Sequence, residues 1–581
     1  MLILGVHYSH DAGAAIIKDG IILAAVNEER YIRKKLYWGF PYHSLKNIFA
    51  LAGVSPKDID YVAFANITPG GGPQRGFDKP SLRKRFMDGV ANTFPSIVSS
   101  DLFVKEYRSF YKIFRRGKSV IDYLRKLGVE APVYYVDHHM SHAASAYYTS
   151  GFNKDALVVT TDGSGDGLCA SVCTVSNDFE LNMVATTPFF HSPATIYAYI
   201  THNLGFVPNK HEGKITGLAA YGNQDVTYDT FASIMKVKGL QYKTQKIKWG
   251  RPASIRLSNL MANKKREDIA AGLQKRFEEV CAEFVSNSLD KYPASNVAVA
   301  GGAFANVKAN QRIAELKKVS KLFVHPHMGD GGLSVGAALS LWAKLKLDKG
   351  SKPKPIEIDN VYFGPEYSNE EIEKTLSQHG LSYKYANAIE DEIAHLINDG
   401  KIVGRFNGKM EYGPRALGNR SIIASPKDKT INDWLNKRLR RSEFMPFAPS
   451  VMRDYAEKVY KNFSSGELAA KFMTVTFDVY EKWAEAGPAV VHIDNTARPQ
   501  TVTKEQNKSY YLTLKAYNEL SKLPFFVNTS FNMHEEPIIC SPEDAVRAFK
   551  EGSVDYLAIG NYLCSMDKSN KVKKSSLKVI N

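Results

Sequence analysis

The sequence predicts an α/β fold whose first half contains one structural plan twice, and two observations lead to this prediction. Residues 2–29 read as three strands, LILGVHY, AAIIKDG and IILAAVNEE, with the acidic, glycine-containing loop SHDAG after the first. Residues 156–187 repeat this plan with ALVVTTD, LCASVCTVS and ELNMVATT, and here the loop GSGDG follows the first strand. Helical spacing of apolar residues follows each three-stranded unit. We therefore expect two related lobes in the first half of the chain.

A pair of such lobes is the plan of the actin and sugar-kinase ATPase fold, in which nucleotide phosphates lie in the cleft between the lobes. Two further loops suit the same cleft. NVAVAGGAFANVKANQRI, residues 296–313, reads as a strand, a Gly-Gly turn and a helix whose first N–H groups suit a phosphate or a ribose. EGKITGLAAYG, residues 212–222, reads as a glycine-marked loop that carries Lys214. One meander or one glycine-rich turn is common, so the prediction depends on their combination.

The segment VDHHMSHAAS, residues 136–145, places His138 and His142 four positions apart at the start of a predicted helix. Residues i and i+4 share one helix face, so both imidazoles are able to bind one ion. The same spacing also occurs without a metal, where the histidines are simply buried or exposed. Asp162 and Asp330 each follow a predicted strand, at the edge where ligands of such sheets bind. Two imidazoles and two carboxylates together predict a site for a divalent transition metal such as iron.

Composition is that of an ordinary globular chain. The 581 residues are 44% apolar and 23% charged, and the length is sufficient for two or more domains. No run of 18 apolar residues occurs and the start MLILGVHYSHDAG reads as a strand, so we expect neither a membrane span nor a signal peptide. The five cysteines form no CxxC pair, and a reducing cytoplasm is therefore the predicted location.

The net charge of +16 is partly due to residues 105–126, which contain eight basic residues and aromatic residues at helical spacing. This segment reads as an amphipathic helix with a solvated basic face. The alternative is a surface for an anionic substrate or a nucleic acid.

The second half of the chain is rich in arginine beside rigid turns. A polar, proline-containing linker at 349–356 divides the chain into predicted domains 1–350 and 351–581. Guanidinium groups with nearby lysine, hydroxyl and amide donors suit phosphate oxygens, whereas isolated surface arginines form salt bridges. We expect a polyanion site formed by Lys409, Arg415, Arg420, Arg438, Arg498, Ser530 and Asn532.

Ten blocks of sequence together carry a family resemblance. They are SHDAGAA (9–15), NEER (27–30), VDHHMSHAASAYY (136–148), TDGSGDG (161–167), GKITGLAAYG (213–222), GGAFAN (301–306), GDGGLSVGAA (329–338), MEYGPRALGNRSI (410–422), PFAPSV (446–451) and NTSFN (528–532). Over nearly its whole length the chain resembles the O-carbamoyltransferases of nodulation and antibiotic biosynthesis, of the tobramycin and cephamycin type.

This resemblance implies an N-terminal Kae1-like domain, which has the duplicated ATPase-type fold, followed by an α/β YrdC-like domain. It implies that the second domain forms carbamoyl adenylate from carbamoyl phosphate and ATP, with Mg²⁺ accompanying the nucleotide. The first domain would hold the adenylate on a metal, commonly iron, and transfer the carbamoyl group to a hydroxyl of a small-molecule acceptor such as a natural product or a sugar. The resemblance is also consistent with a homodimer, and it gives no reason to expect a membrane or nucleic-acid partner.

The resemblance also assigns roles to individual residues. The metal ligands of the family correspond to His138, His142, Asp162 and Asp330. His10 corresponds to a histidine that orients or deprotonates the acceptor hydroxyl, as a general base near neutral pH does. The candidates for binding the leaving AMP are Gly163, Gly165, Gly302 and Asn306.

Four positions depart from the family pattern, and one of them is Leu36, which stands where the family has the histidine of a Lys-His pair, so that any contact from that histidine is absent. Ser442 and Met445 replace a glutamate and an arginine that the family carries beside its phosphate site. Glu535 stands where the family has the glycine of a Gly-Glu-Pro sequence. These departures leave the phosphate contacts open, but they leave the four metal ligands intact.

Several alternatives stay open at this level. A tRNA-modifying threonylcarbamoyl-type transferase would use the same machinery, and a non-catalytic nucleotide-binding module would keep the fold without the chemistry. The hydrogenase-maturation carbamoyltransferases have the reverse domain order and a cysteine-rich zinc region, and a simple sugar kinase would need no histidine pair. The metal is iron, manganese or zinc. The acceptor is not encoded in a readable motif, although 67–130 and 223–265 are the predicted acceptor loops.

Overall fold

The computed structural model describes residues 1–68, 89, 92, 93, 106, 118–247, 249–439 and 447–565. Ser442, Met445, most of the predicted acceptor loop 67–130 and most of the predicted basic helix lie outside these ranges, although α6 (Lys118–Lys126) belongs to that helix. Among the described residues, every helix is too short or too polar to span a lipid bilayer.

The predicted duplication is present as two five-stranded sheets with one topology. The first has the order β4-β3-β1-β6-β7 and the second the order β10-β9-β8-β13-β14. In each, an antiparallel meander is extended by two parallel strands. Their strands are β1 (Leu2–His7), β3 (Gly13–Lys18), β4 (Ile21–Asn27), β6 (Tyr61–Ala65) and β7 (Val133–Val136), then β8 (Ala156–Gly165), β9 (Leu168–Val175), β10 (Leu181–Pro188), β13 (Asn296–Ala300) and β14 (Lys321–Val324). The first half therefore has the predicted duplicated α/β fold.

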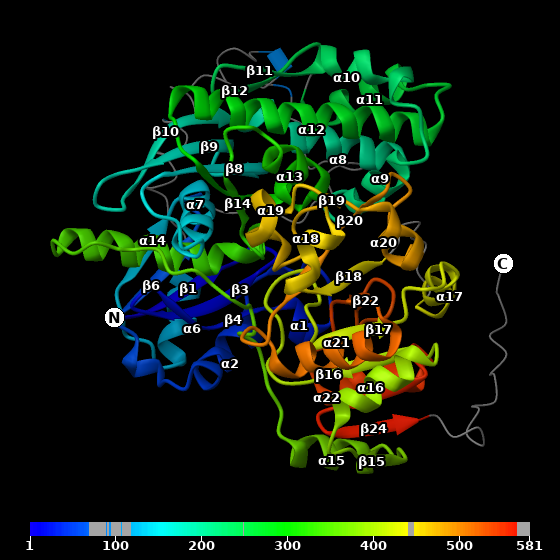
Figure 1. The fold of residues 1–581 in the computed structure, drawn as a ribbon. Helices are drawn as coiled ribbons and strands as arrows, with labels where there is room; N and C mark the ends of the chain where they lie inside the picture. Colours follow the sequence, from blue (N-terminus) through cyan, green and yellow to red (C-terminus); the bar gives the residue numbers. More distant parts are fainter. Residues whose placement is uncertain are drawn as a thin grey trace, which may run out of the picture.

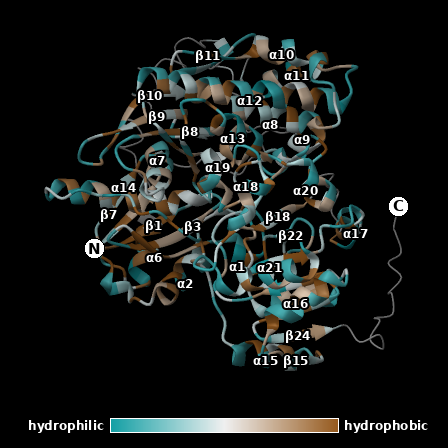
Figure 2. Cartoon of the chain, in the orientation of Figure 1, coloured by the Kyte–Doolittle hydropathy of each residue, from teal (hydrophilic) through white to brown (hydrophobic). Residues whose placement is uncertain are grey.

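Two helices pack between these sheets. Helix α7 (His138–Tyr148) contacts β13 and β8, and α14 (Leu333–Asp348) contacts β1, β6 and β3 as well as α7 (Figure 1). The strands around them carry fully buried aliphatic residues, and Figure 2 shows hydrophobic residues gathered on β1 and β3 in the interior. This packing fixes the start of α7 against the ends of both sheets, where the predicted site residues lie.

The second half is an α/β unit whose buried apolar residues belong to one hydrophobic cluster with those of the second lobe. Its eight-stranded mixed sheet has the order β15-β24-β23-β16-β17-β22-β18-β21. The strands are β15 (Tyr383–Tyr385), β16 (Val403–Phe406), β17 (Arg420–Ala424), β18 (Ala448–Met452), β21 (Gln500–Val502), β22 (Phe525–Ser530), β23 (Tyr556–Ile559) and β24 (Tyr562–Ser565). An α/β second unit was predicted, and the residues between α14 and α15 (Asn369–Gln378) form the extended connection that leads into it (Figure 1).

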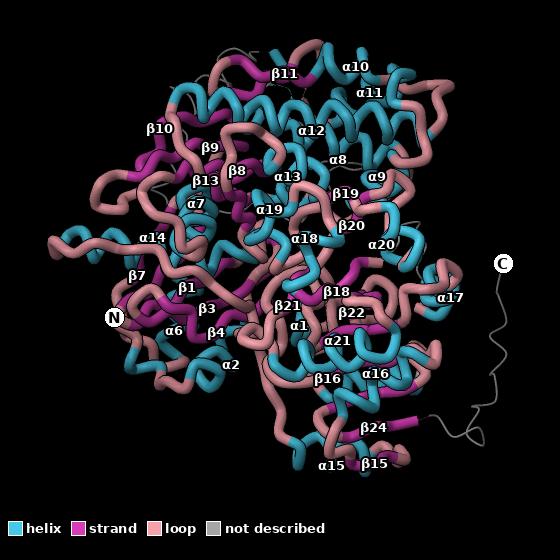
Figure 3. The backbone as a smooth tube through the Cα atoms, in the orientation of Figure 1, coloured by secondary structure: helices cyan, strands magenta, loops and turns pink. Residues whose placement is uncertain are grey.

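The remaining elements cover the sheets and the lobe surfaces. Helix α12 (Arg266–Lys291) is 26 residues long and runs along the top of the second lobe (Figure 3). The other α-helices within the described ranges are α1 (Glu29–Ile32), α2 (Tyr42–Ala52), α8 (Pro193–Asn203), α9 (Glu212–Ala219), α10 (Tyr228–Ile234), α11 (Arg251–Leu260), α13 (Val307–Ala314), α16 (Ile389–Asn398), α17 (Ile431–Arg438), α18 (Ala456–Val459), α19 (Phe463–Ala470), α20 (Glu481–Ala486), α21 (Lys508–Ser521) and α22 (Pro542–Lys550). Short pairs are β2 (Ser9–His10) with β5 (Trp38–Gly39), β11 (Met235–Lys238) with β12 (Gln241–Thr244), and β19 (Phe477–Asp478) with β20 (Thr496–Ala497).

One local prediction was wrong. Residues 212–222 read as a glycine-marked loop, but Glu212–Ala219 form α9, which packs on α12. Ile215 and Leu218 are buried on that contact, and their burial outweighs the low helix propensity of the two glycines in the segment. Lys214 therefore projects from a helix.

Candidate metal centre and its surroundings

The start of α7 places the two predicted histidines as the i, i+4 spacing requires. Asp137 is the N-cap, and its carboxylate accepts a hydrogen bond of 2.8 Å from the backbone N–H of Met140. His138 and His142 are both buried, at 2% and 0% exposure. Because α7 follows β7 directly, the pair faces the carboxyl edges of both sheets.

Two aspartates from the second lobe complete this group. The Nε2 atom of His138 lies 3.2 Å from Asp162 Oδ2 and 3.7 Å from Asp330 Oδ1, and that of His142 lies 3.4 and 3.6 Å from the same two atoms. One donor atom from each of the four residues lies within 4.8 Å of the others. The structure thus brings together all four residues that the sequence predicted as metal ligands.

Hydrogen bonds around His138 fix its ring for binding a cation. Its Nδ1 lies 2.8 Å from Asn66 Oδ1, an oxygen that only accepts, so Nδ1 carries a proton and Nε2 is the nitrogen that faces the two carboxylates. Asp166 accepts from the backbone N–H of His138 at 2.9 Å and from the N–H groups of Ile67 and Thr68. Asp166 therefore ties the residues after β6 to the start of α7 and holds Asn66 near the ring.

The electrostatics of the group fit a divalent cation. Burial disfavours the His138 imidazolium, but Asp162 and Asp330 outweigh burial and raise the pKa of His138 to about 9. Both ring nitrogens of the buried His142 lack a hydrogen-bond partner among the described residues. Two ligands each about 2.1 Å from one metal are about 3.0–3.4 Å apart, close to the separations observed here. A metal bound by these four residues would satisfy His142 and neutralise the two carboxylates.

The bend that presents Asp162 was not predicted. The sequence indicated that β8 ends at Asp162, whereas the strand continues to Gly165 with a register break between Thr161 and Gly165. A Cβ atom on Gly165 would lie 2.1 Å from Cδ2 of His138, and one on Gly302 would lie 3.0 Å from Asp162 Oδ1. These two glycines, predicted as nucleotide contacts, thus also make room for the ligand side chains.

The other predicted nucleotide contacts differ in their surroundings. A Cβ atom on Gly163 would have no heavy atom within 4 Å, so this position is open to a ligand. Asn306 caps α13, and its amide exchanges hydrogen bonds of 3.0 and 2.9 Å with Gln274. Lys214 is half-buried on α9. Their roles toward a nucleotide remain predictions.

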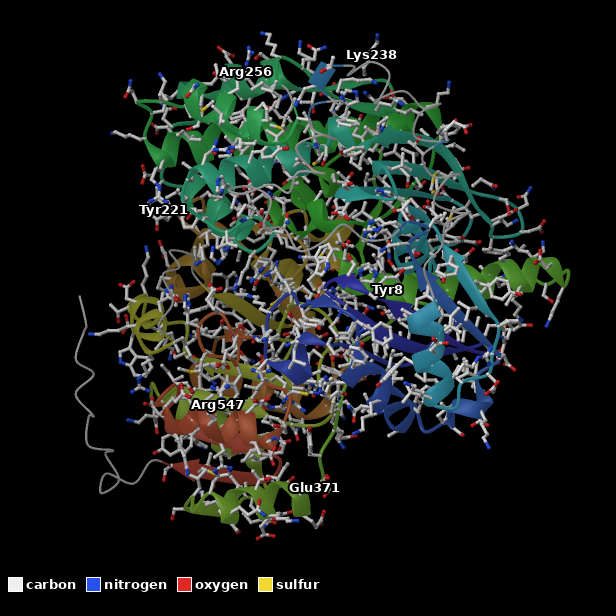
Figure 4. All side chains as sticks on the ribbon, turned by 180° about the vertical axis from the view of Figure 1, so that it is seen from behind. Tyr8, Tyr221, Lys238, Arg256, Glu371 and Arg547 are labelled. Carbon is white, nitrogen blue, oxygen red and sulfur yellow. The ribbon has the colours of Figure 1, made fainter. Side chains whose placement is uncertain are left out.

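His10 lies in the first lobe, three residues after the end of β1. It belongs to β2, which pairs with β5, and its ring meets that of Trp38 edge-on at 5.9 Å. The buried His7, whose pKa burial lowers to about 4, donates from Nε2 to the carbonyl of His10 at 2.9 Å. Tyr8, which directly follows β1, marks this edge in the view from behind (Figure 4). The general-base role of His10 remains a prediction.

Arginines of the second half have unlike environments. Arg420 is fully buried, and its guanidinium donates to the carbonyls of Asn407, Gly408 and Pro365 and stacks on Phe406 at 3.6 Å. These contacts stabilise the β16–β17 connection. Its predicted phosphate role is untested, and bound phosphate would have to compete with these carbonyls.

Arg415 has a different environment. Burial lowers the pKa of its guanidinium to about 10, and its Nε atom lacks a hydrogen-bond partner among the described residues. No carboxylate in the described part of the chain forms an ion pair with it. A half-buried cation of this kind, with a buried Nε–H and no carboxylate partner among the described residues, suits an anionic ligand.

The other predicted phosphate residues of the second half are spread over several elements. Arg438 pairs with Asp555 at 2.8 Å and stacks on Trp434, and Arg498 follows β20 near His492. Lys409 is exposed, and Ser530, at the end of β22, donates to Asn532 at 2.6 Å. Their contribution to a phosphate site stays a prediction.

The two halves meet at the loop that carries Asp330, and the sequence did not predict this contact. The hydroxyl of Tyr412 donates to the carbonyl of Gly331, next to Asp330, at 2.5 Å. Arg30 of α1 donates to the carbonyl of Gly413 at 2.5 Å. Sequence order alone gave no signal for these contacts, although Arg30 and Tyr412 lie in the blocks NEER and MEYGPRALGNRSI.

Comparisons with known proteins agree with this architecture. The family model described as carbamoyltransferase N-terminus matches residues 2–339, and that described as carbamoyltransferase C-terminus matches residues 394–566. An uncharacterized protein of Methanocaldococcus jannaschii (MJ1051) is 34% identical over 98% of this chain and 100% of its own length. Nodulation protein NolNO of Sinorhizobium fredii is 29% identical over 96% of this chain and 79% of its own, and nodulation protein U of Bradyrhizobium diazoefficiens is 25% identical over 99% of each.

The carbamoyltransferase N-terminus model matches the duplicated α/β part of the chain, and the carbamoyltransferase C-terminus model matches the second α/β unit. This arrangement defines a two-part group-transfer enzyme. The chain belongs to the carbamoyltransferase family. It is therefore an enzyme that transfers a carbamoyl group from a donor to an acceptor, and the predicted non-catalytic alternative is set aside.

Proposed function

We propose that the chain is an ATP-dependent O-carbamoyltransferase that acts on a hydroxyl of a small molecule. In the second half, water would first hydrolyse carbamoyl phosphate to carbamate and phosphate. A carbamate oxygen would then attack the α-phosphorus of ATP, with release of pyrophosphate, to give carbamoyl adenylate. The acceptor hydroxyl then attacks the carbamoyl carbon, the bond to AMP breaks, and a carbamate ester and AMP are released. The observation that carries the proposal is the contact between the loop bearing the uncompensated Arg415 and the loop bearing Asp330.

The described residues support a division of this chemistry. Arg415 would neutralise phosphate oxygens, because a charge-assisted hydrogen bond to phosphate would satisfy its buried Nε–H group. His138, His142, Asp162 and Asp330 would hold a divalent metal, for which iron, manganese and zinc are all suitable. Such a metal, when bound, would polarise a carbonyl oxygen as a Lewis acid.

His10 would act on the acceptor. It is half-buried on β2, and its backbone is fixed by the hydrogen bond from His7 and by the pairing with β5. A neutral imidazole in this position could take the proton of the acceptor hydroxyl as the new C–O bond forms. Gly163 has open space beside it, and we propose that the leaving AMP binds next to this residue.

The test is a pair of assays on each variant: pyrophosphate release from ATP, and carbamoyl transfer from synthetic carbamoyl adenylate. Arg415→Ala should stop pyrophosphate release, because each lost charge-assisted contact weakens phosphate binding by about 1.5–3 kcal/mol. The same variant should retain carbamoyl transfer from synthetic carbamoyl adenylate. Asp330→Ala should show the converse. Arg453→Ala is the matched control, because Arg453 is already paired with Glu467 at 2.7 Å. Loss of both activities in folded Arg415→Ala, or loss of pyrophosphate release in Asp330→Ala, would contradict the division.

The acceptor class needs its own measurement. A screen of small hydroxylated acceptors with labelled carbamoyl phosphate should transfer label to one of them. Retention of label on RNA would instead favour the threonylcarbamoyl-type alternative. A homodimer and a cytoplasmic location remain predictions beside this proposal.

A further inference from the structure

We propose that Tyr412, from the second half, is a positioning residue that holds the Asp330 loop in its metal-binding geometry. This inference rests on the proposed function, because it assumes that the four-residue group binds a metal. It adds a residue of the other domain to the support of that group.

The hydroxyl of Tyr412 makes the contact on which the inference is based. It donates to the carbonyl oxygen of Gly331 at 2.5 Å, and Gly331 directly follows Asp330. Tyr412 is only 3% exposed, and burial raises its pKa, so the hydroxyl keeps its proton and remains a donor at neutral pH. Its ring meets that of His327 edge-on at 4.9 Å.

The carbonyl that accepts this bond belongs to a tightly packed turn. Its other contact is a longer one of 3.4 Å from Asn27 Nδ2. A Cβ atom on Gly331 would lie 2.0 Å from the His327 ring and 2.6 Å from Asp11 Oδ2. Without the tyrosine hydroxyl, the carbonyl would keep only the longer bond among those that the described residues make, and the peptide next to Asp330 would be held less firmly.

The loop that carries Tyr412 is itself rigid. Glu411 Oε1 accepts from the backbone N–H groups of Leu417, Asn419 and Arg420 at 2.7–3.0 Å. The carbonyl of Gly413 accepts from Arg30 Nη2, which belongs to the first lobe. Tyr412 therefore reaches Gly331 from a fixed base, and the same base carries Arg415 three residues later.

The test variant is Tyr412→Phe, which keeps the ring against His327 and removes the hydroxyl. The dissociation constant for Fe²⁺ or Mn²⁺ should increase about 10–100-fold, as expected when a group that orients a ligand is removed. Pyrophosphate release should stay within about twofold of the wild type, and transfer from synthetic adenylate should lose kcat at subsaturating metal. The metal affinity is read directly, by calorimetry or by competition with a chelating dye.

Tyr362→Phe is the matched control. The Tyr362 hydroxyl donates to the carbonyl of Leu417 at 2.7 Å, so its removal also deletes a tyrosine–carbonyl bond to the 410–420 loop, together with the 2.9 Å bond that the same oxygen accepts from Asn507 Nδ2. It contacts none of the metal-loop residues 325–332 through that hydroxyl. A purely structural role for Tyr412 would lower the melting temperature of both variants and leave their metal affinities equal.

Three outcomes decide the matter. A weaker metal affinity in Tyr412→Phe than in Tyr362→Phe, with pyrophosphate release intact, supports the inference. Equal metal affinity in Tyr412→Phe and the wild type overturns the inference alone. A wild-type protein that binds neither metal removes the metal part of the proposed function, and the inference with it.

Discussion

Gly165→Ala should remove the metal without changing any of the four ligands. A Cβ atom on Gly165 would lie 2.1 Å from Cδ2, 2.2 Å from Cγ and 2.3 Å from Nε2 of His138. Ordinary carbon–carbon contact begins near 3.4 Å, so the ring must move by about 1.3 Å. Metal–ligand distances are specified to within about 0.2 Å, so this displacement is several times larger than a metal site accepts.

The expected size of the effect follows from this displacement. Losing an outer partner of a ligand already costs about 10–100-fold in metal affinity, so displacing the ligand itself should cost at least about 100-fold. Overpacking should destabilise the fold by about 1–3 kcal/mol, which a domain of this size tolerates. Gly165 does not have a positive φ, so backbone strain is not a second cause.

The assay is metal content after purification without chelator, followed by titration of the apoprotein with Fe²⁺ or Mn²⁺. Gly163→Ala is the control, because its Cβ atom would meet no heavy atom within 4 Å, and it should bind metal as the wild type does. The double variant His138→Ala, His142→Ala sets the level of a protein without the site. If folded Gly165→Ala binds metal with the stoichiometry and affinity of the wild type, the steric reasoning is refuted.

Three further predictions test other parts of the chain. His10→Asn should lower carbamoyl transfer by about 10²–10⁴-fold and leave pyrophosphate release intact, whereas an unchanged transfer rate would make His10 structural. Glu535 has φ of 62° and pairs with Lys210 and His211, and both Glu535→Ala and Glu535→Gly remove these ion pairs. Glu535→Ala keeps the backbone strain, whereas Glu535→Gly relieves about 1–2 kcal/mol of it, so the alanine variant should melt at the lower temperature. The opposite order of melting temperatures would contradict this account. Burial lowers the pKa of His492 to about 4, so the folded state binds fewer protons than the unfolded state between about pH 4 and pH 6.5, and stability should fall as the pH decreases through this range. The melting temperature of His492→Gln should decline less over the same range. An equal decline of the melting temperature with pH in variant and wild type would refute the assignment.

Glu535 illustrates what a departure from a family pattern can and cannot indicate. The sequence shows that glutamate stands in place of glycine, which leaves the local backbone in question. The structure shows that Glu535 keeps a left-handed conformation typical of glycine. It also shows that the carboxylate pairs with Lys210 and His211, which precede α9 in the first half of the chain. These ion pairs offset the strain, and no local rule could have predicted them.

Two arginines of the second half likewise differ in ways that residue type does not predict. Arg415 and Arg420 lie in one block and both suit phosphate by residue type. The structure separates them, because Arg420 donates to carbonyls of its own connection while Arg415 has no carboxylate partner among the described residues. Burial and hydrogen bonding differ between the two, and neither property follows from the identity of the residue.

The sequence by itself determined the features that depend on local periodicity. The i, i+4 histidine pair, the repeated three-stranded meander and the polar residues after strands could all be recognised, because helix and strand geometry act within a few residues. Only the tertiary structure decided how closely His138, Asp162 and Asp330 approach, which glycines make room for them and that Tyr412 supports their loop. These contacts join residues up to several hundred positions apart. They depend on the order of the strands in two sheets and on the packing of the two halves of the chain, which no short stretch of sequence encodes.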